Sequence, residues 1–262
     1  MGSAKKVEVS PQQQRSLRMY NAVMSVLHLL QGALMLWLSN DFAVPLKTSY
    51  LSFDVATKRI APVINEVATV RLGPLVASFL FISGLAHLYI STIGFRSYIR
   101  NLERHANFAR WYEYMLSSSV MIVVIALLCG MFDLPSLILI FAVNAAMIMF
   151  GYMMELHNQT TERTDWTAFI FGCIVGIVPW IVIAMYFFGA AASVDAIPKF
   201  VYGILVSLFV FFNIFAVNMY LQYKGVGRWK DYLFGEQMYV LLSLVAKSAL
   251  AWQVFSGTLR PS

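Results

Sequence analysis

Hydrophobic residues gather in long, nearly uninterrupted runs along this chain. Seven of the runs are long enough to cross a lipid bilayer, which takes about 20 apolar residues in an α-helix. They cover residues 17–38, 67–93, 108–131, 134–154, 167–189, 200–222 and 237–258. The pattern predicts an all-α membrane protein in which seven transmembrane helices form a single domain over residues 1–262.

One connection between these runs is long and polar. Residues 39–66 contain Pro45 and Pro62 and include the stretch LKTSYLSF, in which apolar and polar positions largely alternate. Alternation with a period of two is typical of β-strands. We therefore expect a strand or a β-hairpin in this loop, outside the membrane.

Composition agrees with a membrane location. Hydrophobic residues make up 60% of the chain and charged residues only 12%, whereas soluble domains are roughly half apolar and a quarter charged. The net charge of +6 does not indicate nucleic-acid binding, because the basic residues lie near the ends of the apolar runs. Cys129 and Cys173 both lie inside such runs, so we expect neither a disulfide framework nor a metal site.

Lys and Arg are divided unequally between the two sides of the predicted bundle. With the N-terminus in the cytoplasm, the cytoplasmic side holds Lys5, Lys6, Arg15, Arg18, Arg96, Arg100, Arg104, Arg110, Arg163, Lys224, Arg228 and Lys230. The other side holds Lys47, Lys58, Arg59, Arg71, Lys199 and Arg260. The positive-inside rule therefore predicts a cell-membrane protein with its N-terminus in the cytoplasm. Its C-terminus and residues 39–66 are then extracellular.

Lys247 stands near the middle of the last apolar run. A charged lysine at the centre of a membrane helix costs about 2.5–3.5 kcal/mol on insertion scales. Removal from water favours the neutral amine, which is the form that condenses with an aldehyde to give a Schiff base. The residue alone leaves three roles open: covalent attachment of a ligand, a charge at a transport site, or a structural ion pair.

Glu113 is the natural partner for a positive charge on Lys247. Apart from Glu155 at the end of the fourth run, it is the one carboxylate that we expect within the helices. Hydropathy places Glu113 about one turn inside Arg110, nearer the cytoplasmic edge than Lys247. A helix that begins earlier, around His105, would reduce this difference in depth. An ion pair between Glu113 and Arg110, three residues apart, is therefore the alternative.

Two serines share helix faces with these charges. Ser117 follows Glu113 by four residues, and Ser243 precedes Lys247 by four, so each pair lies on one face of its helix. Their hydroxyls could bind a carboxylate or a polar ligand, or they could bond the helix backbone and allow close packing.

Two histidines lie inside the first and second runs, His28 and His87. Ionisable residues inside a membrane protein usually face a polar cavity. We expect a hydrated internal network here, and no metal, because no third ligand is evident.

Seven helices with a central lysine on the last resemble rhodopsins, and several segments are more specific. The chain resembles heliorhodopsins in RWYEYMLSSSVMIV (110–123), FGCIVGIVPW (171–180), PKFVYGILVSLFVFFN (198–213), YLQYKGVGRW (220–229) and LSLVAKSALAWQVFSGTL (242–259). The similarity extends over nearly the whole chain after about residue 15. Heliorhodopsins have a cytoplasmic N-terminus, in agreement with the distribution of basic residues.

The resemblance implies all-trans retinal bound as a Schiff base to Lys247, with Glu113 as its counterion. It implies that other side chains approach the retinal, namely Tyr114, Ser118, Asn144, Met147, Pro179, Trp180, Phe212 and Ser243, with Ser117 beside the counterion. It places His28, Ser83 and His87 in an inner polar cavity that accepts protons. It also implies a homodimer, in which a hairpin in the loop 39–66 takes part.

Light-driven proton pumps carry a carboxylate on the third helix, a hydroxyl four residues later and a proton-donating carboxylate eleven residues later. They also carry an aspartate four residues before the lysine. The corresponding residues here are Glu113, Ser117, Val124 and Ser243. The missing carboxylates indicate a photosensor with internal proton transfer, a long-lived signalling state and little or no ion pumping.

Two other functions stay open. The protein could be a light-gated or light-driven proton channel or transporter, or an enzyme or transporter that uses Lys247 without retinal. We expect it not to be an enzyme. The basic cytoplasmic face predicts contact with anionic membrane lipids, and an acidic signalling partner is an alternative.

Overall fold

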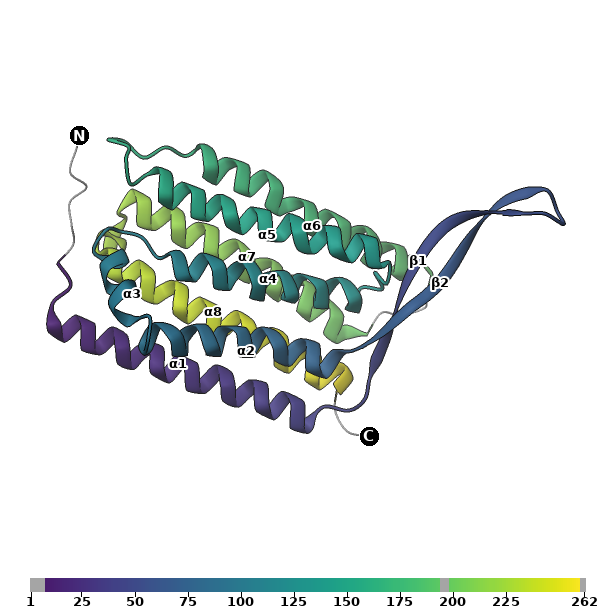
Figure 1. The fold of residues 1–262 in the computed structure, drawn as a ribbon, viewed down its shortest axis with the longest axis horizontal. Helices are drawn as coiled ribbons and strands as arrows, with labels where there is room; N and C mark the ends of the chain where they lie inside the picture. The colour runs from purple at the N-terminus through teal and green to yellow at the C-terminus, as the bar shows by residue number, and fades with distance from the viewer. Residues whose placement is uncertain (1–7, 194–197, 260–262) are drawn as a thin grey trace.

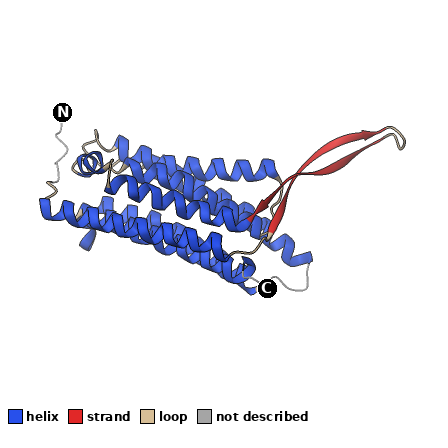
Figure 2. Cartoon of the chain, turned by 60° about the horizontal axis from the view of Figure 1, so that its bottom comes forward, coloured by secondary structure: helices blue, strands red, loops and turns tan. Residues whose placement is uncertain are grey.

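The computed structural model describes residues 8–193 and 198–259. Seven of its helices are long and apolar enough to cross a membrane, and they run side by side in one bundle from which a two-stranded hairpin projects (Figure 1, Figure 2). The spanning helices are α1 (Pro11–Leu38), α2 (Leu72–Ser91), α4 (Phe108–Leu128), α5 (Leu134–His157), α6 (Thr167–Ser193), α7 (Lys199–Lys224) and α8 (Tyr232–Val254). The predicted seven-helix membrane fold is confirmed.

Short elements complete the chain. They are strands β1 (Ala43–Asp54) and β2 (Arg59–Arg71), helix α3 (Phe95–Leu102), a 3₁₀ turn η1 (Gly227–Lys230) and a π-helical turn η2 (Phe255–Leu259). We call the end of the bundle that carries β1 and β2 the hairpin end and the opposite end the far end. α1 begins at the far end, and α8 finishes at the hairpin end (Figure 1).

Three helices begin at least five residues away from the predicted start of their apolar run. α1 begins at Pro11, because Ser10 caps it and Gln13 completes a capping box. α2 begins at Leu72, because residues 67–71 belong to β2. α8 begins at Tyr232, where Asp231 accepts a hydrogen bond from the Leu233 amide. The last helix therefore starts before residue 237 and contains Glu236.

The predicted hairpin is present and is longer than the loop 39–66. β1 and β2 pair antiparallel from Ala43 opposite Arg71 to Asp54 opposite Arg59, with an irregularity at Leu46/Lys47. At its tip, the Asp54 carboxylate accepts hydrogen bonds from the Thr57 hydroxyl at 2.8 Å and the Ala56 amide at 2.8 Å. These bonds hold the pKa of Asp54 below its usual range.

α4 lies in the middle of the bundle, where it packs against α2 and α5 and also touches α6 and α7. It is the most enclosed of the seven spans, whereas α5, α6 and α7 leave most of their surface exposed. The exposed residues of these outer helices are large and apolar, as a lipid-facing surface requires, and include Leu139, Ile174, Ile181, Phe188 and Val206. The centre of α4 is therefore well placed to present polar side chains to the interior.

Candidate functional site

Lys247 and Glu113 form an ion pair inside the bundle. The Lys247 Nζ lies 2.8 Å from Glu113 Oε1, and the two side chains are only 3% and 7% exposed. A lysine and a glutamate at this depth are stable only when each neutralises the other. The expectation that the two residues are partners is confirmed, and the alternative pairing of Glu113 with Arg110 is wrong.

The lysine side chain runs back along its own helix to reach the glutamate. Its Nζ donates a hydrogen bond of 2.6 Å to Ser243 Oγ, one turn closer to the start of α8. Long helical side chains lean toward the N-terminus in this way. Because α4 and α8 both begin at the far end, this lean brings Lys247 toward Glu113, although α4 starts only at Phe108 and not near His105.

A group of buried polar side chains lies on the α1 and α2 side of this ion pair. Ser83 on α2 donates a 2.6 Å hydrogen bond to Glu113 Oε1, and His87 Nδ1 lies 2.8 Å from Asn21 Oδ1 on α1. The ring of His28 stacks on that of His87 at 5.7 Å. His28 is fully buried, and within the described chain neither of its ring nitrogens has a hydrogen-bond partner. His28, Ser83 and His87 are thus all buried on this side of the ion pair, and the polar cavity around them stays a prediction.

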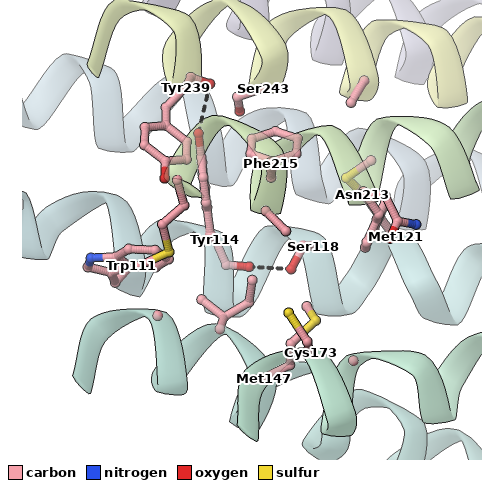
Figure 3. Close-up of a pocket in the computed structure, with 18 of the residues that line it drawn as sticks. Trp111, Tyr114, Ser118, Met121, Met147, Cys173, Asn213, Phe215, Tyr239 and Ser243 are labelled. Carbon is pink, nitrogen blue, oxygen red and sulfur yellow. Dashed lines mark hydrogen bonds between the residues drawn. The ribbon is translucent and has the colours of Figure 1, made fainter. Parts of the chain in front are cut away.

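An apolar cavity of about 190 Å³ lies on the other side of the pair, between α4, α5, α6, α7 and α8. Lys247 is the one charged side chain among the residues that line it. Eight predicted site residues line this cavity, namely Tyr114, Ser117, Ser118, Met147, Trp180, Phe212, Ser243 and Lys247. Figure 3 shows several of them around the opening.

Aromatic rings hold the walls of the cavity in place. Trp180 on α6 contacts Phe209 and Phe212 on α7 edge-to-face at 5.3 and 5.4 Å. On α4, the Tyr114 hydroxyl donates a 2.8 Å hydrogen bond to the Tyr239 carbonyl, and Lys247 Nζ lies 5.2 Å from the Tyr114 ring centre. A dashed line in Figure 3 marks the hydrogen bond between Tyr114 and Tyr239. The contacts between these rings link the helices around the apolar cavity, which the Lys247 side chain also lines.

Three predicted residues do not line the cavity directly. Glu113 lies behind Lys247, as its ion-pair partner. Asn144 is buried and donates hydrogen bonds to Ser118 Oγ at 2.9 Å and Ser119 Oγ at 3.0 Å, so it positions the lining residue Ser118. Pro179 interrupts the hydrogen-bond ladder of α6 beside Trp180.

A known family fits this arrangement. The family model for heliorhodopsin matches residues 17–259. The chain belongs to the heliorhodopsin family. Heliorhodopsins are light-sensing membrane proteins with a retinal chromophore, and they are not classical enzymes. No curated protein matches the chain.

The cavity suits the heliorhodopsin chromophore. Retinal is a long apolar molecule that ends in an aldehyde, and the cavity is a mainly apolar slot with a lysine among its lining residues. The residues that would hold the chromophore are Lys247 at its reactive end and the aromatic side chains of Trp180, Phe212 and Tyr114 along its length.

Several residues that line the cavity of this heliorhodopsin were not predicted from the sequence. The cavity is also lined by Trp111, Met121, Phe215, Met219 and Tyr239, which composition cannot separate from lipid-facing residues. Spacing offers a partial signal, because Trp111 and Ser118 lie seven residues apart, about two helical turns, and so share one face of α4.

Glu236 was also missed, and the expectation that Glu113 and the terminal Glu155 are the carboxylates within the helices is wrong. Glu236 is 1% exposed in the second turn of α8. The signal was Asp231, a helix-capping residue five positions earlier. With this cap recognised, the sequence alone places Glu236 inside the last helix.

Proposed function

We propose that this protein is a photoreceptor that holds all-trans retinal on Lys247. The observation that carries the proposal is the mainly apolar cavity in which the Lys247 amine is the one charged lining group. When bound, retinal supplies the aldehyde that joins this amine as a Schiff base and a polyene that absorbs visible light and isomerises.

Glu113 acts as the counterion in this proposal. Its carboxylate, 2.8 Å from Lys247 Nζ, stabilises a positive charge on that nitrogen in the dark. Ser243 and Ser83 orient the pair, since Ser243 accepts a bond from Nζ and Ser83 donates one to Glu113. The nitrogen at position 247 thereby keeps its proton until light alters its surroundings.

We propose that light then moves the Nζ proton within the protein. The buried polar side chains on the other side of Glu113 supply acceptors, because His28 is buried with two nitrogens that lack a partner in the described chain, and His87 adjoins it. A proton that stays inside returns to Nζ without crossing the membrane. Its slow return would produce a long-lived signalling state.

Two side chains argue against ion pumping. Val124, at the position of a pump's proton donor, is apolar and fully buried in the core of α4. Ser243 stands where a pump carries a second carboxylate, and here it binds Lys247 directly. Proton transfer along a membrane-spanning route requires a chain of titratable groups, and these two positions interrupt it.

A second candidate function is a light-gated or light-driven proton channel or transporter. Buried Glu155 and Glu236 at the far end favour it, because they could continue a proton route from the site. The test is illumination of lipid vesicles that contain the pigment, with an external pH electrode and a protonophore as control. A photoreceptor gives no sustained pH change, whereas a change that the protonophore abolishes would establish transport.

We further propose that the N-terminus is cytoplasmic and the hairpin extracellular. The twofold excess of Lys and Arg on the far-end side supports this orientation. A cysteine introduced at Thr57, at the hairpin tip, should react in intact cells with a thiol reagent that cannot cross the membrane. Failure to react before the cells are lysed would reverse the orientation.

We also propose that the basic cytoplasmic face contacts anionic membrane lipids. We propose in addition that the protein forms a homodimer. The hairpin projects beyond the helices (Figure 2) and exposes apolar side chains to water, including Tyr50, Leu51, Phe53, Ile60 and Ile64. Exposed apolar surface of this kind marks an interaction site. Light scattering of the detergent-solubilised protein should give the mass of two chains.

A further inference from the structure

Three buried side chains form a second ionic group at the far end of the bundle. Arg110 Nη1 lies 2.5 Å from Glu236 Oε1, and Arg110 Nη2 lies 3.2 Å from Glu155 Oε1. Their side chains are 6%, 1% and 3% exposed. We call these three residues the arginine cluster. It joins α4, α5 and α8, the same helices that carry Glu113, Asn144 and Lys247.

The charges in the arginine cluster do not balance. Two carboxylates face one guanidinium, which stays protonated at any physiological pH. The other titratable groups that face the cluster are neutral at pH 7, namely Tyr98, His105, Tyr114, Tyr223, Tyr232 and Tyr239. His105 counts as neutral because partial burial lowers its pKa from the ordinary histidine value. One buried negative charge is left over, and such a charge is normally removed by protonation.

The cluster also shares two residues with the cavity. Trp111 lines the cavity and donates a 2.6 Å hydrogen bond from Nε1 to Glu155 Oε2. Tyr239 lines it too, and the Arg110 guanidinium lies 3.9 Å from the Tyr239 ring centre. Figure 3 shows both rings at one end of the cavity. Arg110 Nε and Tyr239 Oη are buried without a hydrogen-bond partner in the described chain.

We propose that Glu155 and Glu236 share one proton in the dark, held mainly by Glu155, and that Trp111 couples this carboxyl group to the occupant of the cavity. Glu236 is the ionised partner because it lies closer to the guanidinium, at 2.5 Å against 3.2 Å for Glu155. Each carboxyl group has two further donors, the Asn107 and Gln222 side chains for Glu236 and the Asn107 amide and Trp111 Nε1 for Glu155, so the distance to the guanidinium decides between them.

Coupling through Trp111 follows from its two contacts. A change of ligand shape in the cavity that displaces the indole ring lengthens the bond from Nε1 to Glu155. A carboxyl group that loses a hydrogen-bond donor has a higher C=O stretching frequency. The arginine cluster thus reports the state of the cavity at the face of the protein opposite the hairpin. This inference rests on the proposed retinal function.

The experiment is a light-minus-dark infrared difference spectrum of the pigment in lipid, in H₂O and in D₂O. We expect a protonated-carboxyl band that moves to lower frequency in D₂O. It should be absent in Glu155→Gln. It should also be absent in Glu236→Gln, because the one remaining carboxylate then balances Arg110 and ionises. The matched control is Glu66→Gln, on the hairpin, where Glu66 contacts Thr69 and the band should persist.

A third variant tests the coupling separately. Trp111→Phe keeps an aromatic ring and removes the Nε1 donor, so the light-induced carboxyl signal, normalised to the amount of pigment formed, should disappear. A pigment whose band is missing, or is unchanged in both glutamine variants, would overturn the inference and leave the retinal function intact. A chain that forms no pigment with retinal would refute the proposed function instead.

Discussion

Two ionic groups are buried in the described part of the chain, and they differ in which cation they use. At the centre, Lys247 faces Glu113, one charge against one. At the far end, Arg110 faces Glu155 and Glu236. A lysine amine can lose its proton and react, whereas a guanidinium cannot. The lysine pair is therefore suited to bond formation and proton release, and around the arginine any change in protonation falls on the carboxylates.

The surroundings of the two ionic groups also differ. The lysine pair lies between an apolar cavity and the buried polar side chains of α1 and α2, so it borders both a ligand site and candidate proton acceptors. The arginine cluster is enclosed by fixed donors, the Asn107 amide at 2.9 Å from Glu155 and the Gln222 side chain near Glu236. The lysine pair is therefore suited to be a reactive site, whereas the arginine cluster stabilises charge.

Removal of the arginine should have the largest effect on stability. Arg110→Ala leaves two buried carboxylates without a cation and should lower the free energy of unfolding by about 3–5 kcal/mol, measured by denaturation in mixed micelles. Arg71→Ala is the control, because its ion pair with Asp41 is exposed and should cost about 0–1 kcal/mol. Equal losses in the two variants would contradict the difference between buried and exposed charges.

Removal of the central carboxylate should cost less. In Glu113→Gln the unpaired Lys247 amine can become neutral, so we expect a loss of about 2 kcal/mol in the protein without retinal. The same variant with retinal should absorb at longer wavelength, because the counterion stabilises the dark state. Glu155→Gln, away from the lysine, should leave the absorption maximum unchanged, and a matching shift there would remove the distinction between the two groups.

A glycine substitution tests the link between the two regions. A Cβ at Gly151 would lie 2.3 Å from the Trp111 ring, so Gly151→Ala must displace the indole and should cost about 1–2 kcal/mol by overpacking. Gly203→Ala is the control, since a Cβ there meets nothing within 4 Å. The displaced indole should also weaken the light-induced carboxyl signal, and an unchanged signal would show that Trp111 is not the link.

The smallest effect concerns pH at the edge of the arginine cluster. His105 is partly exposed, its ring stacks on Tyr232 at 4.7 Å, and partial burial lowers its pKa. The unfolded chain therefore takes up this proton first as pH falls, and stability declines once pH drops below the ordinary histidine pKa of about 6.5.

His105→Asn removes this dependence and suits the left-handed backbone at this position, where φ is 57°. The difference between the melting temperatures of the original protein and the variant should grow in favour of the variant between pH 7 and pH 5. A difference that does not change with pH would assign the effect to other groups.

The fold could be predicted almost entirely from the sequence, because membrane helices are defined by long apolar runs. The errors came where polar capping signals extend a helix beyond its apolar run, as at Ser10 and Asp231. The hairpin also extends past residue 66, because VATV at 67–70 continues β2. This stretch is as apolar as a membrane helix, so it was assigned to the second apolar run.

The central ion pair could be anticipated from the rarity of charges within the runs, together with the resemblance. The arginine cluster could not, because Arg110, Glu155 and Glu236 each lie near the end of a span, where charges are ordinary. Only the tertiary structure shows that the three ends converge and exclude water. The same limit applies to Trp111 and Tyr239, whose role depends on which way each helix faces.

The most direct test of the retinal function is an absorption spectrum of the purified apoprotein before and after addition of all-trans retinal. We expect the original protein to show a visible absorption band distinct from that of free retinal. This band should be absent in Lys247→Ala. Ser207→Ala is the control and should retain the band, because Ser207 is not among the residues that line the cavity and contacts Gln253 on α8. A visible pigment in Lys247→Ala, or none in the original protein, would contradict the proposed retinal function.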